Sequence, residues 1–340
     1  MSFTLYVHVG SGKAGSSAIQ KTLAKHSKEL ESQGVKYLGL MLERFENPSA
    51  SWQKPYGWPI YRKNPSKNLA ELIDCLRVNI SSMISNGWRA AIWSNESLFG
   101  QFDLLEEVRK LGVELSFDVK VVCYFRNHVS WALSAYKQWG IKHKTYSGRI
   151  QSFNEWHRSR GINFSSVAKR WRSLFGESFI VKNYDSENDL ALGFLELCGV
   201  DVSSVGYSRS LENKTPQKLP LTLWAIYNNQ FEGEVLPDQL QPFLKRSGLL
   251  DSEIKGVSYN SLMPSVSDSE DLAESYTDDL TKLNEILADS GEPPLKFSSA
   301  HKAEDPVSQD DLIAALLMAL VKHDAEIRGL RRKLKALEDK

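Results

Sequence analysis

The order of apolar and polar positions predicts strands that alternate with helices over the first two thirds of the chain. Short apolar runs favour buried strands, and four of them occur, at Leu5–Val9, Ala90–Trp93, Val119–Phe125 and Phe179–Val181. Apolar residues at helical spacing fill the intervals, at residues 19–30, 69–84, 104–111 and 131–139. This alternation predicts an α/β fold in which helices flank a mainly parallel sheet on both faces.

The rest of the chain predicts further helices and then a linker. Helical spacing resumes at residues 190–198, 221–229 and 271–287, and Gly, Pro, Ser and charged residues dominate between residues 289 and 311. We therefore expect a folded domain at residues 1–297, a linker at residues 298–310 and a separate C-terminal helix at residues 311–340.

The C-terminal helix carries a heptad pattern. Its apolar positions alternate at spacings of three and four, with His323 in the one remaining slot: Ile313, Leu316, Leu320, Ile327, Leu330, Leu334 and Leu337. Such a pattern favours a coiled coil, which would make the protein a homo-oligomer. The alternative is an amphipathic helix that packs against its own domain.

Composition narrows the classes of function. The chain has 340 residues with 42 basic and 42 acidic side chains, so no overall field attracts it to nucleic acid. No apolar stretch approaches the ~18 residues of a membrane span, and the first residues lack the pattern of a secretory signal. We expect a cytoplasmic protein. The three cysteines are far apart and read as free thiols, and no cysteine or histidine cluster has the spacing of a zinc site.

Residues 42–67 lack clear periodicity and are rich in Pro, Trp, Tyr and Asn. A loop of this length is typical of a lid or a binding segment. Its aromatic residues Trp52, Tyr56, Trp58 and Tyr61 suit stacking against sugar rings, but they suit structural packing equally well.

A Gly-rich loop follows the first predicted strand. Gly10–Ser17 reads Gly-Ser-Gly-Lys-Ala-Gly-Ser-Ser and leads into a helix, an arrangement that presents backbone N–H groups to a phosphate or sulfate. A Walker A loop would have Lys at the position of Ser16. The strands that end near Glu96 and Arg126 also lack the usual Asp for Mg²⁺. A nucleotide donor that needs no metal fits these residues better than ATP.

Two segments resemble a known family, the PAPS-dependent sulfotransferases, in which PAPS is 3′-phosphoadenosine 5′-phosphosulfate. Residues 7–17 are similar to the family's 5′-phosphosulfate loop, and the surrounding sequence looks closest to bacterial members that act on glycans and similar acceptors. Arg126 ends a strand and Ser134 follows eight residues later, which resembles the 3′-phosphate element. A weaker match at residues 181–185 contains Tyr184, near the position of a tyrosine beside the adenine.

The resemblance implies a P-loop-type parallel sheet and a set of nucleotide-binding residues. This set is Gly12, Lys13, Ala14, Gly15, Ser16, Ser17, Arg126, Ser134 and Tyr184. The sequence departs from the family at Ala18, where an aromatic residue commonly stacks on adenine. The late basic element of the animal cytosolic enzymes is not evident, although Asn213-Lys214-Thr215 is a possible substitute.

We expect the reaction to be transfer of a sulfuryl group from PAPS to an acceptor hydroxyl or amine, with a carbohydrate as the favoured acceptor. Lys13 would stabilise the charge on the leaving nucleotide, and Glu96 is the first choice for the general base. His128 and His143 are reserve candidates for the base, whereas His8 reads as a strand residue. Two alternatives remain: a P-loop kinase or NTPase, and a non-catalytic scaffold with the same fold.

Overall fold

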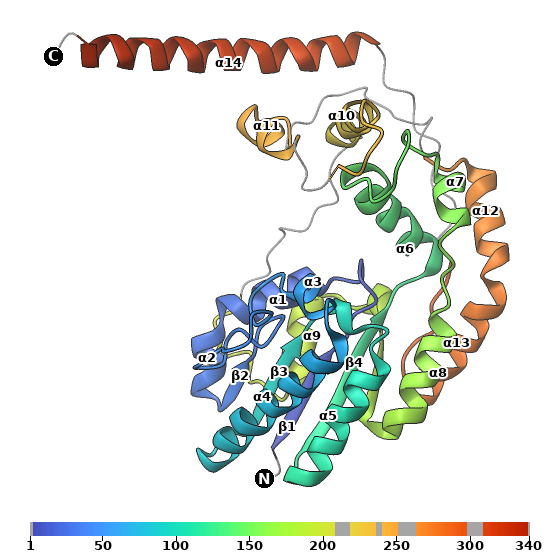
Figure 1. Ribbon diagram of the computed structural model, residues 1–340. Helices are drawn as coiled ribbons and strands as arrows, with labels where there is room; N and C mark the ends of the chain where they lie inside the picture. Colours follow the sequence, from blue (N-terminus) through green and yellow to red (C-terminus); the bar gives the residue numbers. More distant parts are fainter. Residues whose placement is uncertain (1–2, 208–217, 236–239, 251–262, 298–308, 339–340) are drawn as a thin grey trace. The chain divides into compact units, whose positions relative to one another are not determined.

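The structure, a computed structural model, describes residues 3–207, 218–235, 240–250, 263–297 and 309–338. The chain divides into two compact units that are interleaved along the sequence (Figure 1). The first unit comprises Met1–His128, Asn163–Asn213 and Tyr276–Lys296, and the second comprises Val129–Ile162, Lys214–Ser275 and Phe297–Lys340. The boundaries predicted at residues 297 and 311 stay predictions, since most of the predicted linker lies outside the described residues.

In the part of the chain that the structure describes, the first unit holds a sheet of five parallel strands in the order β2-β3-β1-β4-β5. The strands are β1 (Thr4–His8), β2 (Val35–Tyr37), β3 (Ala90–Ser94), β4 (Asp118–Phe125) and β5 (Phe179–Asn183). The predicted parallel α/β sheet is therefore confirmed. The short edge strand β2 was not among the predicted strands.

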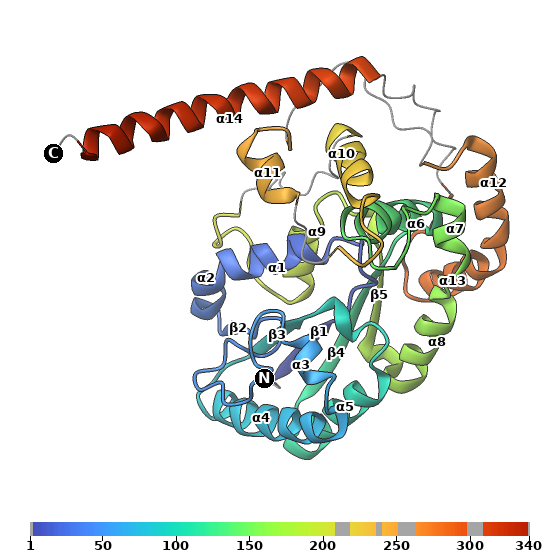
Figure 2. The same ribbon diagram turned by 45° about the horizontal axis from the view of Figure 1, so that its top comes forward.

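Helices cover the two faces of this sheet (Figure 2). One face carries α1 (Ser16–Lys25), α2 (Ser27–Ser32) and α9 (Leu190–Leu197), and the other carries α4 (Pro65–Ser85), α5 (Phe102–Leu115) and α8 (Phe164–Phe175). The unit also contains α3 (Trp58–Tyr61), α13 (Thr277–Asp289) and short 3₁₀ turns at Glu96–Leu98, Gly176–Ser178 and Tyr184–Ser186.

Alternating strand residues fill the two cores on either side of the sheet. Towards α1 and α9, the strand residues Tyr6, Ile92 and Val122 pack with Ile19 and Phe194. The cysteines behave as the sequence predicts, because all three are free and two of them, Cys123 and Cys198, are buried. Burial raises the pKa of both buried thiols, so neither is a ready nucleophile.

The aromatic residues of the segment at residues 42–67 divide into packed and exposed rings. Trp52 and Tyr61 are buried and meet edge to face with their centroids 5.8 Å apart, while Trp58 stacks on Tyr61 at 5.1 Å. Tyr56, by contrast, is 87% exposed. Of the two alternatives left open by the sequence, structural packing therefore holds for Trp52 and Tyr61.

The described elements of the second unit are helical. They are α6 (His128–Ala135, which begins on the last residue of the first unit), a π-helical stretch (Tyr136–Lys142), α7 (Phe153–Arg158), α10 (Lys218–Asn228), α11 (Gln241–Arg246), α12 (Val266–Ser275) and α14 (Gln309–Glu338). The ammonium group of the buried Lys144 donates to the carbonyls of Asn228, Phe231 and Gly233, which ties the segment after the π-helix to the end of α10. None of the helices within the described ranges has the length and apolar character needed to cross a membrane.

Candidate functional site

The Gly-rich loop lies at the carboxyl edge of the central strand. β1 pairs with β3 on one side and β4 on the other, so the segments that follow these three strands emerge beside one another. The chain passes to opposite sides of β1 in its first and second halves, and such a switch point is where open α/β sheets bind ligands. The loop at Gly10–Ser17 therefore occupies the position at which a nucleotide site is expected.

The loop backbone turns repeatedly through the left-handed region. The φ angles are 21° at Gly10, 62° at Gly12, 51° at Lys13 and 82° at Gly15. Glycine adopts these angles readily, whereas Lys13 does so at a cost in strain. Glycine-rich turns of this kind favour an approach of backbone N–H groups to an anion.

The first turn of α1 adds to this site. Gly15 is the N-cap residue of α1 and offers no side chain to cap the helix, and the first turn contains no acidic residue. The leading N–H groups of a helix carry partial positive charge and need an acceptor. A phosphate or sulfate at this end would supply it.

Two buried polar atoms beside the loop have no hydrogen-bond partner among the described residues, namely Nε2 of His8 and Oγ of Ser16. Both lie next to Gly10, where an added Cβ would come within 2.5 Å of Ser16 Oγ and 3.2 Å of His8 Nε2. Nδ1 of His8 is 2.8 Å from Oγ of Ser94 at the end of β3. Burial lowers the pKa of His8 to about 3, so the ring is neutral at physiological pH.

Arg126 links the end of β4 to the loop and to the segment after β5. Its Nη1 donates to the carbonyl of Lys13 at 3.1 Å, and its guanidinium stacks on the ring of Tyr184 with 5.1 Å to the centroid. Asp185 lies 4.0 Å from Nε of Arg126 and accepts a hydrogen bond from the backbone N–H of Asn127. Nε itself is buried and has no hydrogen-bond partner among the described residues. The structure thus brings Lys13, Arg126 and Tyr184 together.

Gly15 is packed against the same cluster, and this makes a testable prediction. A Cβ at Gly15 would lie 2.0 Å from Cδ2 of Leu190 and 3.0 Å from Cε2 of Tyr184, in addition to the strain at its positive φ. We expect Gly15→Ala to lower the free energy of unfolding by about 2–4 kcal/mol. Gly87→Ala is the matched control, because Gly87 has φ 77° with no atom within 4 Å of an added Cβ, and should cost only about 1 kcal/mol. Equal losses in urea unfolding would contradict a role for the contact with Leu190 and Tyr184.

Glu96 follows β3 and is held by α1. Its Oε2 accepts a hydrogen bond from Nε2 of Gln20 at 2.7 Å, and the same Nε2 is 3.4 Å from the carbonyl of Ser94. The carboxylate is partly exposed, so it retains access to solvent. Two other predicted residues, Ser134 on α6 and His143 directly after the π-helical stretch, belong to the second unit, so the structure does not bring them together with Arg126 in the first unit.

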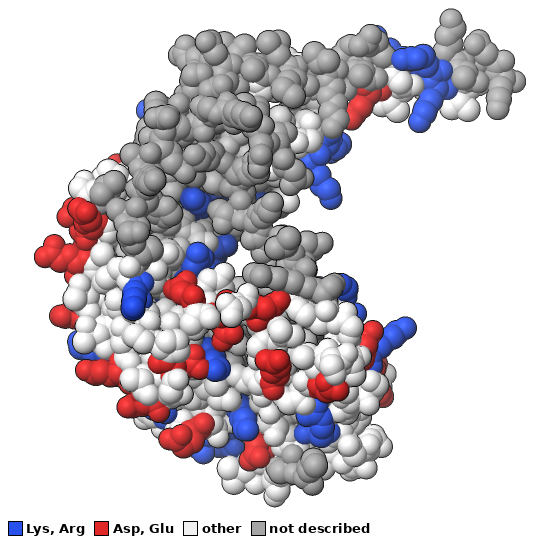
Figure 3. Space-filling view, turned by 180° about the vertical axis from the view of Figure 1, so that it is seen from behind, with Lys and Arg blue, Asp and Glu red and all other residues white. Residues whose placement is uncertain are grey.

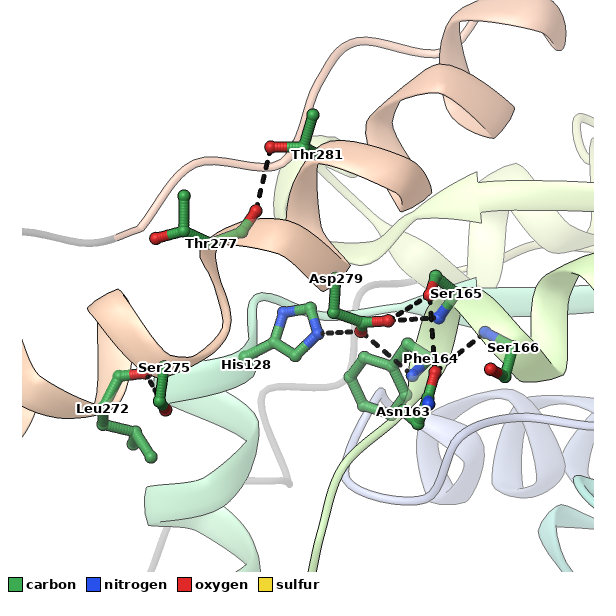
Figure 4. A network of polar contacts seen from close by, with 10 residues as sticks. All are labelled: His128, Asn163, Phe164, Ser165, Ser166, Leu272, Ser275, Thr277, Asp279 and Thr281. Carbon is green, nitrogen blue, oxygen red and sulfur yellow. Dashed lines mark hydrogen bonds and ion pairs between the residues drawn. The ribbon is translucent and has the colours of Figure 1, made fainter.

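His128, a reserve candidate for the base, is committed to a structural network (Figure 4). Its buried ring lies 2.6 Å from Oδ2 of Asp279 and stacks on Tyr276 with centroids 5.0 Å apart. Asp279 also accepts from the backbone N–H groups of Phe164 and Ser165 at 3.1 Å, and from the hydroxyl of Ser165. Burial opposes ionisation of Asp279, but the hydrogen bonds from His128 and Ser165 outweigh it and lower its pKa. The geometry gives His128 a structural role.

Sequence reasoning missed three partners of the site: Asp185 beside Arg126, Gln20 on Glu96 and Ser94 on His8. Of these three, only Asp185 could have been found from the sequence, because it directly follows Tyr184 in the segment at residues 181–185 that weakly resembles the family. The possible 3′-phosphate segment Asn213-Lys214-Thr215 lies outside the described residues.

The described residues show neither a metal-binding group nor, on the face drawn in Figure 3, a surface of one charge that would attract a ligand to the site. Within the described ranges, no group of three or more His, Cys, Asp or Glu side chains is arranged to hold a metal ion. Acidic and basic side chains are intermingled over the described surface that Figure 3 shows. Any attraction for an anion therefore arises locally, from the loop and Arg126.

Comparison with known proteins gives no family for the chain. No family model matches the sequence, and no curated protein matches it. Among solved structures, the chain is similar to one from the PezAT chromosomal toxin–antitoxin system of the human pathogen Streptococcus pneumoniae, with 13% sequence identity and a TM-score of 0.30. The match covers 55% of this chain and 69% of that chain. A similarity at this TM-score carries no argument about activity.

Proposed function

We propose that the first unit is a PAPS-dependent sulfotransferase. The observation that supports this proposal is the loop at Gly10–Ser17, whose left-handed residues and uncapped helix end suit an anion, and whose Lys13 carbonyl accepts a hydrogen bond from Arg126. The unpartnered buried atoms Ser16 Oγ and His8 Nε2 support it, because a bound anion would give polar atoms at this position a partner. The resemblance of residues 7–17 and of Arg126 to the family supports PAPS as the donor.

In this proposal the loop binds the 5′ end of the donor and Arg126 binds its 3′-phosphate. The N–H groups of Gly15, Ser16 and Ser17 and the two serine hydroxyls hold the 5′-phosphate. Nε of Arg126 makes no hydrogen bond among the described residues but faces Asp185, so the 3′-phosphate would compete with this carboxylate for it. Asp185, 4.0 Å away, reduces the positive potential of the guanidinium, and it therefore limits the affinity of this contact. Tyr184 supports the guanidinium from below its plane and lies close to the adenine in the same proposal.

The chemical step is an in-line displacement at sulfur. The acceptor oxygen or nitrogen forms a bond to sulfur while the bond from sulfur to the bridging oxygen of PAPS breaks. The electron pair leaves on that oxygen, and the products are the sulfated acceptor and 3′-phosphoadenosine 5′-phosphate. Negative charge grows on the bridging oxygen, so the ammonium group of Lys13 stabilises the transition state more than the bound donor. This step needs no metal ion.

The acceptor must lose a proton as it attacks, and we assign this proton to Glu96. The hydrogen bond from Gln20 fixes one oxygen of the carboxylate, which leaves the other oxygen to accept the proton. Glu96 follows β3 and the loop follows β1, so base and donor site lie at neighbouring strand ends. A carbohydrate remains the favoured acceptor class, on the resemblance to glycan-modifying enzymes.

Calorimetric titration with 3′-phosphoadenosine 5′-phosphate, with and without Mg²⁺ and against ATP, tests the donor site. We expect the product nucleotide to bind more tightly than ATP, with an affinity that does not depend on Mg²⁺. Preference for ATP in the presence of Mg²⁺ would overturn the proposal in favour of a kinase or NTPase. Binding of neither nucleotide would favour the non-catalytic scaffold.

A further inference from the structure

The helix α14 presents an apolar stripe that its own unit leaves uncovered. The described apolar positions of the heptad are 48% to 70% exposed: Leu316, Leu320, Ile327, Leu330, Leu334 and Leu337. On the same helix Ala315 and Ala319, at a c and a g position of the heptads, are buried, with 0% and 1% exposure. Packing of α14 on its own chain therefore does not use the stripe at these six positions.

We propose that the stripe is the seam of a parallel, two-stranded coiled coil between two copies of this chain. The helix runs without interruption from Gln309 to Glu338, so it contains every position of the pattern. Ile and Leu alternate at the a positions and Leu occupies three of the four d positions, a composition compatible with two strands. This inference does not depend on the proposed enzymatic activity.

The charges beside the seam identify the second copy as the partner. In a parallel dimer each g position faces the e position five residues later on the other chain. Glu326 would then face Arg331, and Lys333 would face Glu338, so both pairs join opposite charges and each forms twice. Glu326, Arg331 and Lys333 are all exposed and accessible to a second helix.

The same charges select one register. A slip of seven residues would put Glu326 of one chain opposite Glu338 of the other. On the other side of the same dimer it would put Lys333 opposite Arg331 and Glu326 opposite Asp324. Like charges at all of these facing positions disfavour the slip. A partner helix of unrelated sequence has no reason to match this arrangement, whereas an identical chain matches it automatically.

One layer of the seam is polar. His323 occupies a d position, lies 3.6 Å from Glu326 through Nδ1, and stacks on Phe243 of α11 with centroids 5.1 Å apart. A single polar layer in an otherwise apolar seam fixes register and strand number at some cost in stability. Through the stack on Phe243, this one layer of the stripe contacts α11 of its own chain, unlike the six exposed apolar positions.

Light scattering of the full chain tests the proposal directly. We expect a mass of twice the 38.4 kDa of one chain. Leu330→Asp should raise the dimer dissociation constant by about 100-fold or more, since it places two carboxylates within the seam. Arg332→Asp is the control, because Arg332 is exposed on α14 at an f position, away from the seam, and should leave the mass unchanged. A monomeric, trimeric or tetrameric wild-type chain would overturn the proposal.

Exchange of charges tests the facing pairs and the orientation. Glu326→Arg and Arg331→Glu should each weaken the dimer, because each variant places like charges opposite each other. An equimolar mixture of the two variants should restore dimers, since every facing pair is then of opposite charge. A mixture no tighter than either variant would refute the pairing. Leu337→Cys should form a disulfide between two chains, and failure to do so in a dimeric protein would show an antiparallel arrangement and contradict the proposal.

Discussion

The variant Lys13→Ala is expected to lose sulfuryl transfer by about 100- to 1,000-fold while it keeps its fold. Lys13 lies within the Gly-rich loop, and its own backbone carbonyl accepts a hydrogen bond from Arg126. In the proposed step its ammonium group stabilises the charge that appears on the leaving oxygen, and this contribution is largest in the transition state. The rate constant with saturating PAPS should therefore fall much more than the affinity for the product nucleotide. Radiolabelled sulfate transfer, once an acceptor is found, gives the first quantity and calorimetry gives the second.

Two further variants show whether activity is lost because the charge of Lys13 is removed or because the strained backbone at this position changes. Lys13 has φ 51°, which glycine adopts without strain, so Lys13→Gly removes the charge and relaxes the backbone. It should lose as much activity as Lys13→Ala. Lys21→Ala removes an exposed lysine of α1 outside the loop and should behave like the wild type. Wild-type activity in Lys13→Ala would refute the assigned role.

Arg126→Ala is expected to weaken binding of 3′-phosphoadenosine 5′-phosphate by about 10- to 100-fold, because charge-assisted hydrogen bonds to the 3′-phosphate are lost. Arg126 also contacts the loop through Lys13, so a loss of affinity could come from either end of the nucleotide. Adenosine 5′-phosphate, which lacks the 3′-phosphate, distinguishes the two causes. If Arg126 binds the 3′-phosphate, this ligand should bind the variant and the wild type almost equally.

Equal weakening for both nucleotides would show instead that Arg126 acts through the loop. Arg170→Ala provides the control, since Arg170 is an exposed arginine of α8 that pairs with Asp103. Surface pairs of this kind contribute little, and the variant should bind both nucleotides as the wild type does. Arg126→Lys should not restore the affinity, because an ammonium group cannot reproduce the planar, two-pronged contact of a guanidinium.

The sequence predicted the sheet well where a strand forms a continuous apolar run. The observed β1, β3, β4 and β5 each overlap a predicted run. In β1, β3 and β4 the run is continuous because these strands are largely buried on both faces, whereas the edge strand β5 alternates between buried and half-buried residues. The strand β2 has only three residues, Val35–Tyr37, with a lysine in the middle, and so few positions define no period. The order of the strands and the interleaving of the two units depend on contacts between distant segments, which periodicity does not report.

The site divides in the same way into local and non-local parts. The anion loop was predictable because its glycines and serines are consecutive and follow a strand. The cluster of Arg126 with Tyr184 and Gly15 requires β1, β4 and β5 to be neighbours, and only the sheet order establishes that. The structural role of His128 could likewise not be predicted from the sequence, because its partner Asp279 is 151 residues away along the chain.

The network around Asp279 has a mechanical consequence. The chain crosses between the two units five times, and three of these crossings adjoin the network: after His128, before Asn163 and before Tyr276. His128 contacts Asp279 and Tyr276, and the N–H groups of Phe164 and Ser165 donate to the same carboxylate. Tension on any of these three connections to the second unit therefore reaches the hydrogen bonds of one aspartate. We expect these three of the five crossings to yield together under force, since hydrogen bonds to the same carboxylate hold all of them.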